Sequence, residues 1–196
     1  RGPQRLDHRA GAWGLPIMSS ALEALIQGLG DAPLTTYKGN AYRMHNPVWA
    51  WSPLSMEGAT ITGGRFNPKG FPALYLGLSV NGCWAEVSGG ATNAALAPQM
   101  LCSYAIEIDG VIDLRSNYRD LFAAPWRAML LGNREPPGWA LCRAISAHPQ
   151  INGILVPSYV MTSESNLVLY RLPPKSVKLF DPEGRLTTLY GDQLDL

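Results

Sequence analysis

Charged residues are scarce in this chain. Of its 196 residues, 16 are Lys or Arg and 15 are Asp or Glu, so charged residues make up 16% and the net charge is +1. Globular domains usually have about a quarter charged residues. No basic run breaks this balance, so the sequence gives no electrostatic basis for nucleic-acid binding, and we expect none. The 46% of apolar residues instead predicts a folded domain with a large core.

Cysteines and long apolar runs are also few. The three cysteines, Cys83, Cys102 and Cys142, are far apart and form no CxxC pair, which argues against a disulfide framework and a structural zinc site. No segment approaches the roughly 20 apolar residues that span a bilayer, and the first residues lack the apolar core of a signal peptide. We therefore expect free, buried thiols in a cytoplasmic protein that has no membrane segment.

The sequence predicts one domain that follows a short N-terminal extension. Residues 1–17 show no periodicity, and we interpret them as a leader or loose extension before a single domain at 18–196. Ser19 or Ser20 can cap a helix that ends at Gly30, since the apolar positions between them recur at helical spacing.

The remaining pattern mixes short strands and helices. We predict strands at 41–45, 73–77, 101–109, 151–157, 166–172 and 176–180, and helices at 79–87, 118–131 and 137–147. In the third strand, Cys102, Tyr104, Ile106 and Ile108 should point inward. The segment 46–72 is long for a loop, which favours a functional role. The irregular spacing of the strands predicts an α+β fold.

A glycine-rich segment precedes the second predicted strand. Gly63, Gly64 and Gly70 permit positive φ and close backbone approach, as a phosphate-binding loop requires. Arg65 adds a planar fork of donors that suits a pyrophosphate. The spacing is neither GxGxxG nor a P-loop, so a structural turn with a surface arginine remains the alternative.

Two further polar features lie in apolar surroundings. Glu86 follows Trp84 on the helix after the second strand, and glutamates are rarely buried there without a partner. The loop PSYVMTSESN, residues 157–166, separates two apolar strands and carries several hydroxyls. Considered singly, these features are better explained by a solvated helix face and by ordinary turn chemistry.

In chain order, five segments resemble a known family: YRMH at 42–45, GGRFNPKGFPALYLGLS at 63–79, AEV at 85–87, and GILVPSYV and NLVLYRLP within 153–173. Together they are similar to the RES domain, the toxin family found beside Xre-type antitoxins in bacterial toxin–antitoxin operons. The arginine, glutamate and serine that name this family correspond to Arg65, Glu86 and Ser158. Phe66 stands where the family usually has tryptophan.

The choice of serine stays open at this stage. Ser163 and Ser165 lie in the same loop region as Ser158. We take Ser158 because a Pro-Ser pair directly ending an apolar strand matches the family pattern.

The resemblance implies a fold and an activity. It implies an ADP-ribosyltransferase-like fold, in which two small, mostly antiparallel sheets flanked by helices surround a cleft. It also implies cleavage of the nicotinamide–ribose bond of NAD⁺, with ADP-ribose passed to water, to phosphate or to a protein. No metal is expected, because nicotinamide leaves as a neutral group.

The resemblance also implies residue roles. Arg65 and the backbone of Gly63 and Gly64 would bind the pyrophosphate, with Arg43 on a phosphate or ribose. Tyr75 would stack on nicotinamide, Glu86 would stabilise the oxocarbenium-like transition state, and Ser158 would orient the substrate. Asn67 and Asn166 complete the expected NAD site, and His45 is a weaker candidate.

The family habit implies an Xre-type antitoxin as partner. The aromatic residues of 46–54 would either join that interface or pack on the core. Two alternatives stay open: a mono-ADP-ribosyltransferase that modifies one cellular protein, and a non-enzymatic binding module.

Overall fold

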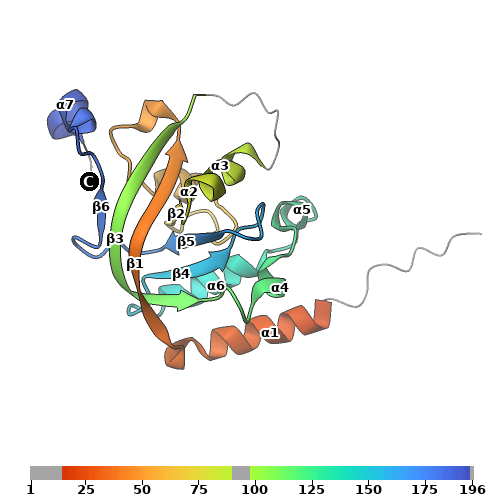
Figure 1. Cartoon of the computed structure of the whole chain (residues 1–196). Coiled ribbons are helices and arrows are strands. Elements are labelled where there is room, and N and C mark those ends of the chain that lie inside the picture. Colours follow the sequence, from red (N-terminus) through yellow and green to blue (C-terminus); the bar gives the residue numbers. More distant parts are fainter. Residues whose placement is uncertain (1–14, 90–97, 195–196) are drawn as a thin grey trace, which may run out of the picture.

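The computed structural model describes residues 15–89 and 98–194 (Figure 1). The strands are β1 (Leu34–His45), β2 (Leu74–Gly77), β3 (Met100–Asp113), β4 (Gly153–Pro157), β5 (Ser165–Leu169) and β6 (Val177–Leu179). The α-helices are α1 (Leu15–Gln27), α2 (Glu57–Thr62), α3 (Val80–Ser88), α4 (Arg119–Phe122), α5 (Trp126–Leu131), α6 (Pro137–Ser146) and α7 (Arg185–Tyr190), and short 3₁₀ turns are η1 (Leu29–Asp31), η2 (Pro47–Trp49) and η3 (Gly191–Gln193). The expected α+β class is therefore confirmed.

The six strands form one sheet, in the order β1-β2-β5-β4-β3-β6. Because β1 also pairs with β3, the strands β1, β2, β5, β4 and β3 close into a circuit, and β6 lies outside it on β3. Only β3 and β4 are parallel among these pairs. The sheet is thus mostly antiparallel, as expected, but it is one hydrogen-bonded sheet where we expected two. A single residue pair, Tyr42 with Gly77, joins β1 to β2.

Strand β1 is longer than the sequence predicts. It begins at Leu34 instead of residue 41, and it pairs with β3 from Leu34 opposite Ile112 to His45 opposite Met100. Most side chains of its first half are exposed, so they follow no apolar alternation. Long-range pairing with β3 therefore decides the conformation of this segment, as is common for strands.

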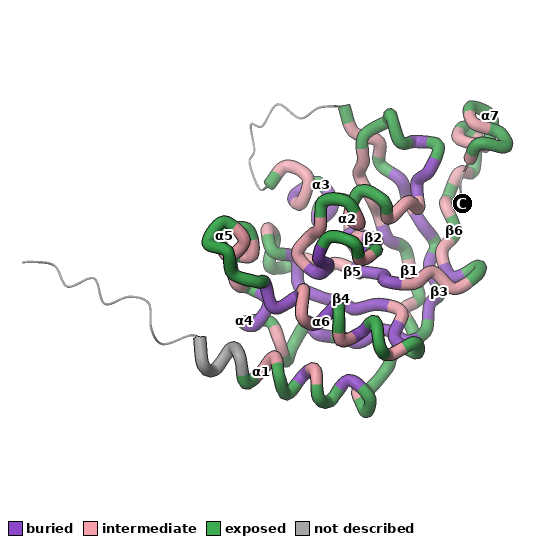
Figure 2. The backbone as a smooth tube through the Cα atoms, turned by 180° about the vertical axis from the view of Figure 1, so that it is seen from behind, coloured by how far each residue is buried: buried purple, intermediate pink, exposed green. Residues whose placement is uncertain are grey.

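The core has two clusters, and buried residues concentrate on the strands (Figure 2). One cluster packs the sheet against α1 and α6, and includes Leu25, Leu141 and Val168. The other comes mainly from the five strands of the circuit. It contains the four β3 residues expected to point inward, Cys102, Tyr104, Ile106 and Ile108, each at most 4% exposed.

Two helix predictions need correction. Helix α1 starts at Leu15 and ends at Gln27, so it begins before Ser19, within the expected extension, and ends before Gly30. Pro16 is compatible with this, because the first turn of a helix needs no N–H from it. The rest of the expected extension, 1–14, lies outside the described residues. The single helix expected at 118–131 is two, α4 and α5, separated at 123–125, where Pro125 precedes α5.

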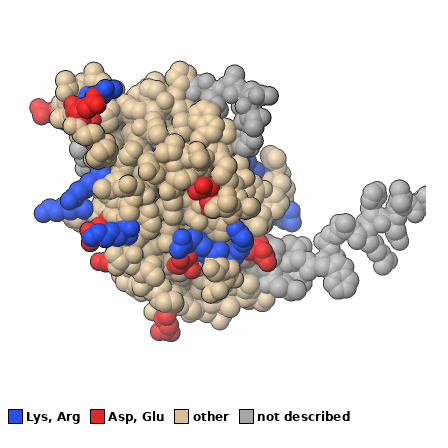
Figure 3. Space-filling model, viewed as in Figure 1, with Lys and Arg blue, Asp and Glu red and all other residues tan. Residues whose placement is uncertain are grey.

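The segment 46–72 contains η2 and α2 instead of a continuous loop. Its tryptophans Trp49 and Trp51 are 55% and 38% exposed, and their ring centroids lie 6.3 Å apart. On the face shown in Figure 3, basic side chains have acidic side chains beside them. Within the described part of the chain, no helix is long and apolar enough to cross a membrane.

Candidate active site

The glycine-rich loop is shaped by two glycines. Gly63 ends α2 with φ 73°, a conformation that favours glycine. At Gly64, a Cβ atom would lie 2.6 Å from the Tyr75 hydroxyl oxygen, so a side chain does not fit. The Gly64 N–H donates to the Asn67 carbonyl at 2.9 Å, and Trp139 Nε1 donates to the Gly64 carbonyl at 2.7 Å. Glycine at 63 and 64 thus permits a tight loop.

Hydrogen bonds of Tyr75 and Asn67 hold this loop in place. The Tyr75 hydroxyl accepts from the Phe66 N–H at 2.8 Å and donates to Asn67 Oδ1 at 2.7 Å. Asn67 is completely buried, and its Nδ2 donates to the carbonyls of Ala59 and Phe71, each at 2.8 Å. Burial raises the pKa of Tyr75, which keeps the phenol a donor. Asn67 therefore shapes the loop and lies behind the pocket surface, whereas we expected it to contact NAD directly.

Arg65 joins the loop to two other elements. Its Nη1 donates to the Pro157 carbonyl at 3.0 Å, and its Nη2 donates to the Phe122 carbonyl. The guanidinium carbon lies 4.8 Å from the Phe66 ring centroid and 5.3 Å from that of Tyr159. Its Nε is buried and has no hydrogen-bond partner among the described residues. Burial lowers the pKa of Arg65, an effect that the Glu86 carboxylate opposes.

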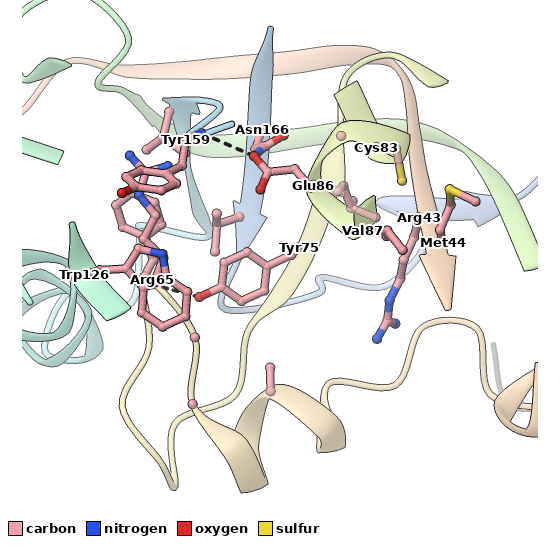
Figure 4. Close-up of a pocket in the computed structure, with 18 of the residues that line it drawn as sticks. Arg43, Met44, Arg65, Tyr75, Cys83, Glu86, Val87, Trp126, Tyr159 and Asn166 are labelled. Carbon is pink, nitrogen blue, oxygen red and sulfur yellow. Dashed lines mark hydrogen bonds between the residues drawn. The ribbon is translucent and has the colours of Figure 1, made fainter. Parts of the chain in front are cut away.

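Helix α3 carries Glu86 into the same region. Ser79 caps this helix by accepting from the Gly82 N–H at 2.9 Å, and Cys83 and Ala85 are buried. Glu86 Oε1 accepts from Ser158 Oγ at 2.6 Å, Asn166 Nδ2 at 2.8 Å and the backbone N–H of Tyr159 at 3.3 Å. Figure 4 shows the carboxylate directed from α3 toward Asn166 and Tyr159. Oε2 accepts no hydrogen bond from the described residues, so it remains available to a ligand.

Ser158 contacts Glu86, whereas the other two candidate serines do not. Ser158 follows β4, is 3% exposed, and its Oγ also accepts from the N–H groups of Val160 and Met161 at 3.2 and 3.1 Å. Ser163 is exposed, and Ser165 begins β5 and pairs with Pro157. The geometry therefore favours Ser158 as the serine that acts with Glu86.

These elements surround a pocket of about 330 Å³ (Figure 4). Its lining includes the predicted residues Arg43, Gly63, Gly64, Arg65, Tyr75, Glu86 and Asn166, together with Phe66, Trp126, Arg127 and Tyr159. The structure thus brings together most of the predicted site from separate strands, helices and loops. Ser158 and Asn67 do not line the pocket, but each forms a hydrogen bond with a residue that does: Ser158 with Glu86, and Asn67 with Tyr75.

Arg43 and His45 lie toward a neighbouring pocket of about 220 Å³, which Trp49 and Trp51 also line. Arg43 Nη1 donates to the carbonyls of Pro53 and Ser55 at 3.0 and 2.8 Å, and burial lowers its pKa. Arg43 lines both pockets, whereas His45 lines only this neighbouring one. His45 Nε2 lies 3.4 Å from Cys102 Sγ, and burial, with Arg43 nearby, lowers its pKa to about 4.

The sequence analysis did not identify Trp126, Arg127 and Tyr159 as residues of the main pocket. Trp126 and Arg127 come from the first turn of α5, inside a stretch that we expected to be one continuous helix. Pro125 marks that break in the sequence, but it does not indicate which residues then face a pocket. Tyr159 follows Ser158 directly, and its position next to a candidate serine was the one available indication.

Comparison with known proteins agrees with this geometry. The RES domain family model matches residues 40–189. A chain in the crystal structure of the M. tuberculosis MbcT–MbcA toxin–antitoxin complex matches with a TM-score of 0.63 and 26% sequence identity. The match covers 81% of this chain and 90% of that one. Among curated protein sequences, none matches. The family match spans most of the chain and includes Arg65, Glu86 and Ser158, and we conclude that the chain belongs to the RES domain family.

Proposed function

We propose that this protein is the toxin of a toxin–antitoxin system and that it cleaves the nicotinamide–ribose bond of NAD⁺. The observation that carries the proposal is the Glu86 carboxylate. Three donors hold its Oε1, while Oε2 is left to the pocket. Such a group suits a reaction whose transition state is positively charged at carbon.

The chemistry follows from that carboxylate. As the bond between ribose C1′ and the nicotinamide nitrogen breaks, its electron pair leaves with neutral nicotinamide. The ribose then acquires oxocarbenium character, comparable to that in glycoside hydrolysis. Oε2 of Glu86 would stabilise this charge and bind ribose hydroxyls. A fixed carboxylate needs little reorganisation during the reaction, which is the basis of electrostatic catalysis.

The aromatic lining suits the leaving group. Phe66, Tyr75, Trp126 and Tyr159 all line the pocket. A planar cationic heterocycle such as nicotinamide in NAD⁺ is attracted to aromatic faces. Because the Tyr75 hydroxyl is engaged with Phe66 and Asn67, only its ring would serve this role. Ser158 would act through Glu86, which its hydroxyl orients, instead of touching the substrate.

The proposal also concerns the fold relationship, the compartment and the partner of this protein. We infer a relationship to the ADP-ribosyltransferase fold, cytoplasmic action on the NAD⁺ pool, and neutralisation by an antitoxin of the Xre type. The MbcT–MbcA complex supports the antitoxin partner, because the matching chain there belongs to a toxin–antitoxin pair. The acceptor of ADP-ribose is water, phosphate or a protein side chain.

Glu86→Gln tests the role of the carboxylate. The amide oxygen of glutamine can accept the same three hydrogen bonds, so the variant should fold and should bind ADP-ribose with a Kd close to that of the wild type. Losing the charge should slow nicotinamide release by about 100-fold or more, the scale for one transition-state contact. Unchanged turnover in the folded variant would remove Glu86 from the mechanism.

A further inference from the structure

The pocket has few charged side chains with which to bind a dinucleotide. Its charged lining residues are Arg43, Arg65, Arg127 and Glu86. The pyrophosphate of NAD⁺ carries negative charge on both phosphates, and planar guanidinium groups are well suited to bind it. The three arginines differ in how free each guanidinium is to bind the pyrophosphate.

Two of the three arginines are anchored to backbone carbonyls of the fold, although the buried Nε of Arg65 has no partner among the described residues. Arg43 donates to two backbone carbonyls of the segment that follows η2. Arg65 donates to two others and lies between the rings of Phe66 and Tyr159. Both side chains are partly buried, and burial lowers the pKa of each. Turning either guanidinium toward a ligand would break contacts that connect separate elements.

Arg127 differs from both. It is exposed, and it forms no hydrogen bond or ion pair within the described residues. Its guanidinium carbon lies 4.7 Å from the ring centroid of Trp126, which also lines the pocket. A guanidinium stacked on an aromatic ring keeps its N–H groups in its own plane, where they are free to point outward to a ligand.

The size of the pocket adds a second argument. Its volume of about 330 Å³ lies at the lower end of the roughly 300–1,000 Å³ typical of ligand sites. With the nicotinamide riboside half beside Glu86, the rest of a dinucleotide must extend past the rim. An exposed lining residue such as Arg127 is placed to meet the phosphates there.

We propose that Arg127, stacked on Trp126, binds the pyrophosphate of the dinucleotide, a role that the sequence analysis gave to Arg65. This inference rests on the proposed function. Arg65 then acts as a positioning residue that fixes the glycine-rich loop against β4 and α4. Helix α5 accordingly belongs to the substrate site, and it would favour pyrophosphate-containing ligands over nucleosides.

The test compares Arg127→Ala with a matched control, Arg134→Ala. Arg134 is also exposed, lies shortly after α5, and does not line the pocket. Three quantities are measured: the Kd of ADP-ribose by calorimetry, and kcat and KM for nicotinamide release from NAD⁺. Arg127→Ala should weaken ADP-ribose binding and raise KM by about tenfold, as expected for a lost charge-assisted contact at an accessible site. Its kcat should stay within about threefold, since the contact is present before and during bond cleavage.

Salt dependence supplies a further readout. Because the contact is ionic and exposed, KM of the wild type should rise with NaCl, and KM of Arg127→Ala should rise less. Arg134→Ala should behave as the wild type in every measurement. Equal Kd and KM for Arg127→Ala and wild type would overturn this inference and leave the proposed function intact. A wild-type protein that neither binds ADP-ribose nor cleaves NAD⁺ would overturn both.

Discussion

Ser158→Ala separates the positioning of Glu86 from its charge. The Ser158 hydroxyl donates to Glu86 Oε1 at 2.6 Å and accepts from two backbone N–H groups, and the residue is 3% exposed. The substitution removes one hydrogen bond to a carboxylate, and such bonds contribute about 1.5–3 kcal/mol. The two N–H groups belong to Val160, which is partly buried, and Met161, which is 37% exposed, so water can replace their acceptor. We therefore expect the free energy of unfolding to fall by about 1–3 kcal/mol.

Turnover should fall less than in Glu86→Gln. Asn166 Nδ2 and the Tyr159 N–H still hold Oε1, so the carboxylate stays in the pocket with more freedom. A loss in kcat of about tenfold corresponds to about 1.4 kcal/mol of lost transition-state stabilisation. KM should change little, because Ser158 does not line the pocket.

The assay combines thermal unfolding with nicotinamide release measured for Ser158→Ala and for Ser163→Ala. Ser163 is exposed in the same loop and provides the matched control. For a chain of this size, the expected destabilisation lowers Tm by about 2–12 °C. A folded Ser158→Ala protein with wild-type kcat would refute the reasoning, as would an equal loss of kcat in Ser163→Ala.

Two other predictions concern the frame of the site. Tyr75→Phe removes the hydroxyl that bonds Phe66 N–H and Asn67 Oδ1. The free energy of unfolding measured in urea should therefore fall by about 1–3 kcal/mol. A variant as stable as wild type would show that the loop does not depend on this hydroxyl. His45 has a pKa of about 4 in the folded protein, below its unfolded value of about 6.5. Between these two values the unfolded state binds a proton that the folded state does not. The free energy of unfolding should therefore fall as pH decreases from 6.5 to 4. His45→Gln should flatten that part of the curve of unfolding free energy against pH, and a curve that keeps its wild-type slope would assign the acid sensitivity to other groups.

Local patterns made some features predictable. The alternation from Cys102 to Ile108 identified the buried face of β3, and the helix expected at 79–87 is α3, which Ser79 caps. The glycines at 63 and 64 indicated a loop with close backbone approach, which the contact with Tyr75 explains. These features are set by neighbours in the sequence, so a sequence pattern can reveal them.

Other features depend on distant partners. The first half of β1 is a strand because β3 pairs with it, and its own exposed residues do not indicate this. Closure of the sheet depends on the pairing of β1 with both β2 and β3, which no local pattern encodes. Arg127 lines the pocket from the first turn of α5, and nothing in its neighbouring sequence indicates that position. By contrast, the family resemblance placed Arg65, Glu86 and Ser158 in one region before the fold was known, although it did not distinguish substrate contacts from supporting ones.

The central claim is that this protein cleaves NAD⁺ at the nicotinamide–ribose bond. Its most direct test is ¹H NMR of the purified wild-type protein with NAD⁺, in phosphate buffer, in phosphate-free buffer, and with added cell lysate. The account predicts free nicotinamide in at least one of these samples, and the sample in which it forms identifies water, phosphate or a protein as the acceptor. NAD⁺ that stays intact in all three, beside a protein shown to be folded and free of antitoxin, would contradict the account.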